Sequence, residues 1–99
     1  MSTIIEAANR AEATAMLIRA GFRVYRPEAD VAGEDLVVRT PGGLLNAVQL
    51  KSRLHVNWEK YGEQGLWMLF PATGYRGIAR SWYLVDHDLL FAILWSKHH

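Results

Sequence analysis

Hydrophobic and polar residues alternate in two runs that flank a Thr-Pro-Gly-Gly sequence at residues 40–43. A period of two is typical of β-strands with one buried face. Proline fits the second position of a tight turn, and glycine supplies the positive φ needed at the third. The pattern therefore predicts an antiparallel hairpin with strands over residues 35–40 and 45–54.

The same alternation sorts the side chains of the hairpin onto two faces. The apolar face carries Leu36, Val38, Val48 and Leu50. The opposite face carries the polar side chains of Asp35, Gln49 and Lys51. We therefore expect an acid, an amide and an amine to converge on one side of the hairpin, where strand formation does not require them.

The N-terminal segment predicts a helix over residues 3–20, because Ser2-Thr3 followed by Glu6 fits a capping signal and no proline or glycine occurs before residue 21. Its apolar stripe consists of Ala13, Met16, Leu17 and Ala20. Glu6 continues this stripe, whereas Glu12 lies roughly a quarter-turn away. We expect Glu6 to face inward and Glu12 to face solvent, although the helix dipole alone also favours an acid in the first turn.

The remaining elements follow from the same patterns and from capping and turn residues. They are a strand over 22–26, one or two helical turns over 55–62, a fully buried strand over 66–70, a loop over 71–80, a strand over 82–85 and a helix that begins after Asp86 and runs through Leu94. Asn57 and Gly62 are expected to cap the short helix. The order α-β-β-β-α-β-β-α predicts an α/β fold with one mixed sheet flanked by helices.

Composition limits the organisation of the chain. Its 99 residues are 51% hydrophobic and 21% charged, which predicts a single domain over residues 1–99. The absence of cysteine excludes disulfides and thiolate metal sites, and no apolar run reaches membrane-spanning length. We expect a cytoplasmic protein without a membrane anchor. Because the net charge is only +1, nucleic-acid binding would require locally concentrated positive charge.

The polar residues of the hairpin and first helix together resemble the PD-(D/E)XK nuclease superfamily, which includes restriction endonucleases, Holliday-junction resolvases and some intron-encoded homing endonucleases. Family members have an acid in the first helix, an aspartate at the start of the second strand, and an acid, a spacer and a lysine in the third. The corresponding residues are Glu6, Asp35, Gln49 and Lys51. Gln49 replaces the usual acid, and Glu34 replaces the usual proline.

The resemblance implies a restriction-endonuclease-like fold and a metal-dependent DNA endonuclease that hydrolyses phosphodiester bonds. Asp35, Gln49 and Glu6 would hold one or two Mg²⁺ ions, with Mn²⁺ as a substitute and the Leu50 carbonyl as a further ligand. Lys51 would either orient the attacking water or neutralise charge on the phosphate. An amide at position 49 also fits a catalytically inactive nuclease-fold module that binds nucleic acid or assists assembly.

DNA contacts are expected from basic and aromatic side chains around this site. The candidates are Arg23, Arg26, Arg53, Arg76, Arg80 and Tyr75. The ordinary role of a surface arginine is solvation, and His55 and His87 are expected to make local hydrogen bonds. Two DNA strands and a small binding surface favour a homodimer or higher homo-oligomer, with residues 91–95 as either an interface or part of the core.

Overall fold

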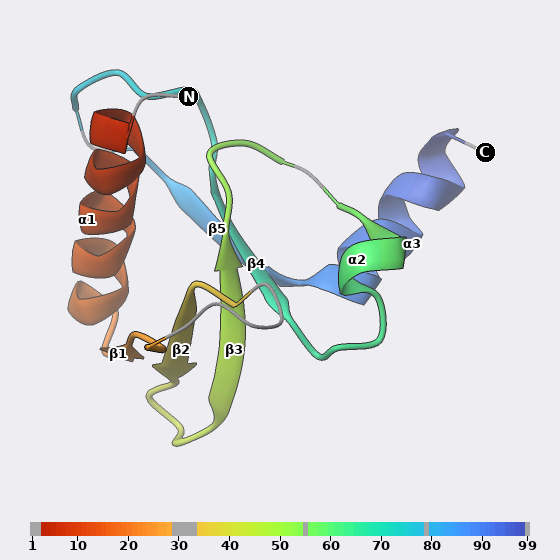
Figure 1. Ribbon diagram of the computed structural model, residues 1–99, viewed down its shortest axis with the longest axis horizontal. Coiled ribbons are helices and arrows are strands. Elements are labelled where there is room, and N and C mark those ends of the chain that lie inside the picture. Colours follow the sequence, from red (N-terminus) through yellow and green to blue (C-terminus); the bar gives the residue numbers. More distant parts are fainter. Residues whose placement is uncertain (1–2, 29–33, 55, 79, 99) are drawn as a thin grey trace.

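The computed structural model describes residues 3–28, 34–54, 56–78 and 80–98, so the capping signal at Ser2 and the role expected of His55 lie outside the described residues. Within these ranges, three helices and five strands follow one another in the predicted order (Figure 1). They are α1 (Thr3–Arg19), β1 (Arg23–Tyr25), β2 (Leu36–Arg39), β3 (Leu45–Leu50), α2 (Trp58–Tyr61), β4 (Trp67–Pro71), β5 (Trp82–Asp86) and α3 (His87–His98). The predicted α/β class is confirmed.

The sheet is mixed, and its strands lie side by side in chain order. β1, β2 and β3 form an antiparallel meander, β3 and β4 are parallel, and β4 and β5 are antiparallel. A parallel pair needs a crossover of about a dozen residues or more. Residues 51–66 provide it, and they include the single turn of α2.

The turn between β2 and β3 differs from the prediction in one detail. The Gly43 amide donates to the Thr40 carbonyl at 2.8 Å, and the positive φ of 95° belongs to Gly43, whereas Gly42 has no positive φ. A three-residue hairpin loop with glycine in this place closes with a small bulge, which requires positive φ after the turn rather than within it. β3 also ends at Leu50, earlier than the predicted residue 54.

Two groups of apolar side chains pack on the two faces of the sheet. The group beneath α1 is buried and consists of Ala13, Leu17, Leu36, Val38, Val48 and Leu69. The group beneath α3 consists of Met68, Phe70 and Leu90. Figure 1 shows that α1 stands at one side of the molecule, whereas α2 and α3 lie at the other. β4 supplies both groups, so its predicted burial on both faces is confirmed.

The inward stripe of α1 is rotated from the predicted one. Asn9, Ala13 and Leu17 are buried at intervals of four residues, whereas Ala20 is exposed. A stripe chosen from apolar residues alone could not include Asn9. This side chain is buried because it accepts a hydrogen bond from Arg80, which approaches α1 from the segment before β5.

The last helix begins as predicted, because the Asp86 carboxylate accepts a hydrogen bond from the Leu89 amide at 3.0 Å. Phe91 packs between Trp58 and Trp95, with ring centroids 5.2 and 6.0 Å apart. Trp95 is 55% exposed, so this segment contributes to the surface as well as to packing. No helix within the described ranges is long and apolar enough to span a membrane.

Candidate functional site

A cleft of about 500 Å³ opens where the first helix meets the end of the β2–β3 hairpin. It is lined by Glu6, Asn9, Arg10, Arg26, Pro27, Asp35, Leu50, Lys51 and Ser52. Two of these residues are acids, and three are basic residues of high pKa. The cleft therefore combines oxygen ligands for a cation with positive groups for an anion.

Asp35 lies immediately before β2 and is held there by two hydrogen bonds to β3. Its amide donates to the Val48 carbonyl at 2.8 Å, and its Oδ2 accepts from the Leu50 amide at 2.8 Å. The carboxylate is thus anchored at the point where β3 ends and Lys51 begins.

Glu6 reaches the cleft from the first turn of α1, but its side chain is exposed. We expected the Glu6 side chain to face inward, and this expectation was wrong. The buried stripe of the helix passes through Asn9 instead. Asn9 and Arg10 follow Glu6 by three and four residues, and this spacing places side chains on one side of a helix. The spacing from Glu6 could therefore have predicted Asn9 and Arg10 as cleft residues.

Glu12 does not face solvent as predicted. Its Oε2 accepts hydrogen bonds from Arg80 Nε at 3.2 Å and from Trp82 Nε1 at 2.6 Å, and the ion pair with Arg80 is largely buried. Burial alone would raise the pKa of the Glu12 carboxyl, but the hydrogen bonds from Arg80 and Trp82 and the charge of Arg80 lower this pKa below its ordinary value of 4.5. Glu12 therefore belongs to a structural network.

Arg80 is correspondingly removed from the surface. Its side chain is only 2% exposed, and its guanidinium donates to Glu12, to Asn9 and to the Thr73 carbonyl. These contacts hold the guanidinium within the protein, and the phosphate contact expected of Arg80 stays a prediction. Tyr75 is 47% exposed and packs against Arg80, with 5.6 Å between the ring centroid and the guanidinium carbon.

Gln49 stands behind the cleft rather than in its lining. The pairing of Leu36 with Val48 places Asp35 opposite Gln49, as predicted from the alternation. The Gln49 side chain, however, is only 4% exposed and contacts Tyr61 of α2. Its Oε1 is buried and has no hydrogen-bond partner among the residues that the structure describes. The structure thus brings Glu6, Asp35 and Lys51 to one cleft and leaves Gln49 outside it.

Tyr61 is a neighbour of Lys51 that sequence reasoning missed. The ammonium groups of Lys51 and Lys60 lie 5.5 and 5.3 Å from the centre of its ring, within the range of cation–π attraction. Burial alone would raise the pKa of the Tyr61 phenol, but hydrogen bonds from Gln49 and Lys60 and the two lysine charges lower it. The short helix α2 thereby positions Lys51.

The other predicted DNA-binding arginines lie in three places. Arg26 lines the cleft and donates from Nη2 to Thr14 Oγ1 at 3.0 Å. Arg53 and Arg76 are exposed in the segments after β3 and β4. Arg23 lines a separate depression beside the β2–β3 turn.

His87 makes the local hydrogen bonds expected of it. Its Nε2 accepts from the Asn57 amide at 3.2 Å, and its Nδ1 lies 2.9 Å from Asp88 Oδ1. The described ranges contain no group of three or more histidine, cysteine, aspartate and glutamate side chains arranged to hold a metal ion. Any cation in the cleft would therefore depend on the two carboxylates and on other oxygen atoms.

Comparisons with protein-family models, curated proteins and solved structures find no match to this chain.

Proposed function

We propose that the protein is a metal-dependent DNA endonuclease similar to the PD-(D/E)XK nucleases. One observation carries the proposal: Glu6, Asp35 and Lys51, which lie in three separate parts of the chain, line a single cleft. Arg10 and Arg26 add positive charge to the same cleft. Convergence of acids, a lysine and arginines in one concave site is suited to phosphodiester hydrolysis.

The residues of the cleft fit Mg²⁺ better than a softer metal. Mg²⁺ is commonly bound through one or two carboxylates, together with waters and substrate phosphates, so it does not need a complete set of protein ligands. Asp35 and Glu6 would hold it, and no cysteine is present to favour a softer ion. A bound metal ion would polarise a phosphoryl oxygen and lower the pKa of a coordinated water.

The cationic residues of the cleft would act on the phosphate and on the attacking water. Arg10 and Arg26 would hold phosphate oxygens, since a guanidinium matches their geometry through paired hydrogen bonds. Lys51 would either orient the water or neutralise the charge that develops on the phosphate. Its ammonium group also lies 5.5 Å from the centre of the Tyr61 ring.

Glu6→Gln is expected to lower cleavage about tenfold and to raise the Mg²⁺ concentration needed for half-maximal activity, because it removes one of two carboxylates. Initial rates on supercoiled, branched and palindromic DNA over a Mg²⁺ series measure both effects. The matched control is Glu59→Gln, which removes an exposed carboxylate outside the cleft. Equal Mg²⁺ dependence in the two variants would exclude Glu6 from the site.

A second function, nucleic-acid binding or assembly without catalysis, is favoured by the position of Gln49. Because its amide is buried outside the cleft, only Glu6 and Asp35 supply carboxylates among the described residues of the lining. A binding module has no need of a metal, so calorimetric titration of Mn²⁺ separates the two functions. The nuclease should bind Mn²⁺ and lose that binding in Asp35→Asn, whereas no heat in either protein would support the binding module.

A further inference from the structure

Two arginines lie directly opposite each other on neighbouring strands, far along the hairpin from Asp35. The register pairs Arg23 of β1 with Arg39 of β2. Opposed residues of an antiparallel pair project from the same face with their Cβ atoms about 4.5–5.5 Å apart, and like charges in this position destabilise the sheet. The free protein therefore maintains an unfavourable contact at this place.

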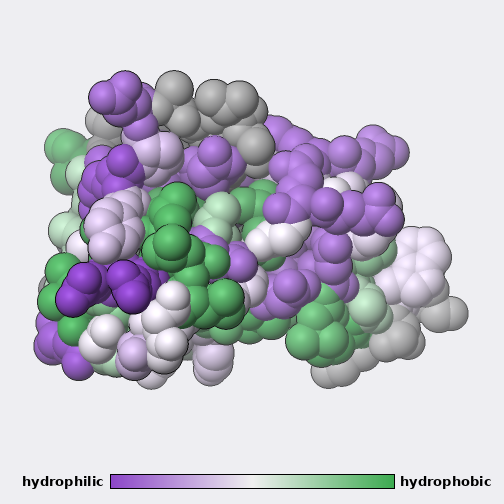
Figure 2. Space-filling view, turned by 90° about the horizontal axis from the view of Figure 1, so that it is seen from below, coloured by the Kyte–Doolittle hydropathy of each residue, from purple (hydrophilic) through white to green (hydrophobic). Residues whose placement is uncertain are grey.

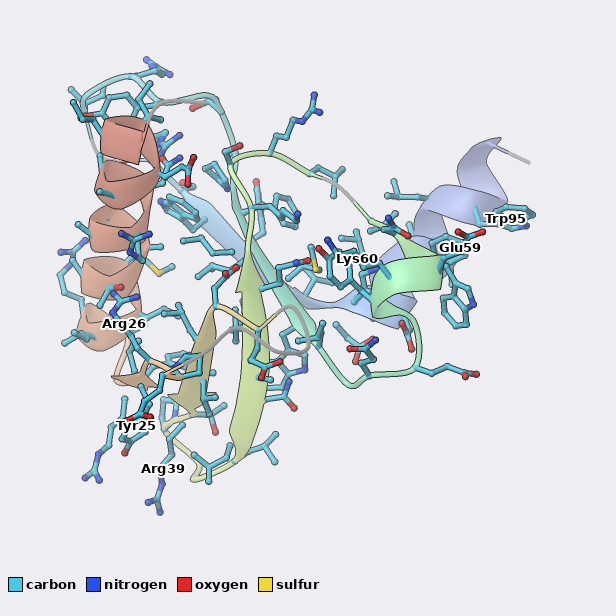
Figure 3. All side chains as sticks on the ribbon, in the orientation of Figure 1. Tyr25, Arg26, Arg39, Glu59, Lys60 and Trp95 are labelled. Atoms are coloured by element: carbon cyan, nitrogen blue, oxygen red, sulfur yellow. The ribbon has the colours of Figure 1, made fainter. Side chains whose placement is uncertain are left out.

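Neither charge is compensated within the part of the chain that the structure describes. Both side chains are exposed, and neither guanidinium has an ion pair or hydrogen bond with another described residue. In Figure 3 the labelled Arg39 projects away from the body of the molecule at the end of β2. The two guanidinium groups are thus available to an external anion.

The arginines also share a concave surface. A depression of about 340 Å³ is lined by Gly21, Arg23, Arg39, Thr40, Pro41, Gly42 and Gly43. It lies between the turn after α1 and the turn between β2 and β3. Figure 2 views the molecule from this end, where strongly hydrophilic side chains lie beside hydrophobic ones.

Gly21 allows these turns to approach, and Gly43 allows the second turn its backbone conformation. Gly21 has φ of 91°, and a Cβ placed on it would lie 3.3 Å from Pro41 Cγ. Gly43 has φ of 95°, and a Cβ there would lie 3.8 Å from Arg39 Nη2. Side chains at either position would be strained, and at Gly21 the added atom would also press the two turns apart. The backbone is therefore suited to keeping this small depression open beside the arginines.

We propose that the depression binds a phosphate group through Arg23 and Arg39. A guanidinium pair that converges on one anion can make several charge-assisted hydrogen bonds, and neutralisation by the anion would relieve the repulsion between the two cations. The Thr40 hydroxyl, which accepts from the Leu44 amide at 3.1 Å, retains a proton that it can donate.

The spacing assigns this phosphate to a nucleic-acid backbone, a step that rests on the proposed function of the cleft. Arg39 follows Asp35 by four residues, which corresponds to roughly 13 Å along an extended strand. Each strand of a duplex carries one phosphate charge per 3.4 Å of helix axis, so a duplex that reaches the cleft also presents phosphates at this distance from it. One DNA duplex could therefore contact both the cleft and the depression.

DNA binding without divalent metal tests the site independently of cleavage. Affinity for a 20-base-pair duplex should be measured by fluorescence anisotropy over a NaCl series for the wild type and for Arg23→Gln/Arg39→Gln. Loss of one phosphate contact should reduce the slope of log affinity against log salt by about 1. The control, Arg19→Gln, removes an exposed charge that lines neither concavity. A slope in Arg23→Gln/Arg39→Gln equal to that of the control would overturn the proposal.

The bound phosphate could belong to a nucleic-acid backbone or be a free phosphate ion. The melting temperature of the protein, measured with and without inorganic phosphate, separates these two sources. Arg39→Glu should raise the melting temperature of the free protein, because it replaces a like-charge pair by an opposite-charge pair, and should weaken duplex binding. Stabilisation by phosphate together with an Arg-dependent salt slope would support the nucleic-acid site. Stabilisation by phosphate with an unchanged slope would identify a site for free phosphate and overturn the backbone assignment. A lower melting temperature in Arg39→Glu would show that the arginine is structural.

Discussion

Asp35→Asn is expected to reduce phosphodiester cleavage by about two to three orders of magnitude. The asparagine can still accept the hydrogen bond from the Leu50 amide, which spans 2.8 Å in the wild type, so the end of the hairpin keeps its geometry. The variant loses the negative charge through which a metal ion would be held. Several kcal/mol of charge stabilisation depend on that metal, and about 1.4 kcal/mol corresponds to a tenfold change in rate.

Initial rates of plasmid nicking in Mg²⁺ and in Mn²⁺ measure this loss. Lys51→Ala should cause a loss of similar size by a different route, since it removes the ammonium group above Tyr61 while leaving both carboxylates. Asp35→Asn should abolish Mn²⁺ binding, whereas Lys51→Ala should not. If either variant cleaves at the wild-type rate with an unchanged melting temperature, the proposed active site is wrong.

The second large effect concerns stability. Glu12→Ala should lower the free energy of unfolding by about 3 kcal/mol, because removal of one partner leaves the buried guanidinium of Arg80 without its carboxylate. Trp82 Nε1 would lose its acceptor at the same time. Urea denaturation at neutral pH measures the change. Glu59→Ala, on an exposed surface, should alter stability by less than about 0.5 kcal/mol, and a similar value for Glu12→Ala would exclude a stabilising network.

The contribution of Glu12 should also depend on pH in a defined direction. Its pKa in the folded state lies below the ordinary value of 4.5, despite the opposing effect of burial. The stabilisation is therefore complete above the pKa of the unfolded chain and disappears as the pH falls through the lower pKa of the folded state. Glu12→Gln lacks this titration, so its stability should approach that of the wild type in acid. A constant difference between pH 7 and pH 3 would contradict the assignment.

The order of the helices and strands could be predicted from the sequence because local signals determine it. Alternation identified β2 and β3, and Asn57 and Asp86 accept the capping hydrogen bonds that their positions indicated. The orientation of α1 could not be obtained in this way. Asn9 and Glu12 face inward because Arg80, about 70 positions later, supplies their partner, and no local pattern contains that contact.

The candidate site could be predicted only in part. Pairing of β2 with β3 accounts for the proximity of Asp35 and Lys51, which follows from register alone. Alternation also placed Gln49 on the polar face, but it does not reveal what covers that face. Gln49 is buried, hydrogen-bonds to Tyr61 of α2 and does not line the cleft. The helical spacing after Glu6 contained the information for Asn9 and Arg10, which an analysis of acids alone overlooked.

The agreement between strand order and chain order has a consequence for how the protein folds. Three of the four strand pairings that the structure describes join antiparallel strands that are neighbours in the chain. The parallel pairing of β3 with β4 must instead close the segment 51–66, which is longer than the segments within the antiparallel pairs, and loop-closure entropy rises slowly with loop length. We therefore expect the antiparallel pairs to form first and the β4–β5 pair to dock onto β3 afterwards.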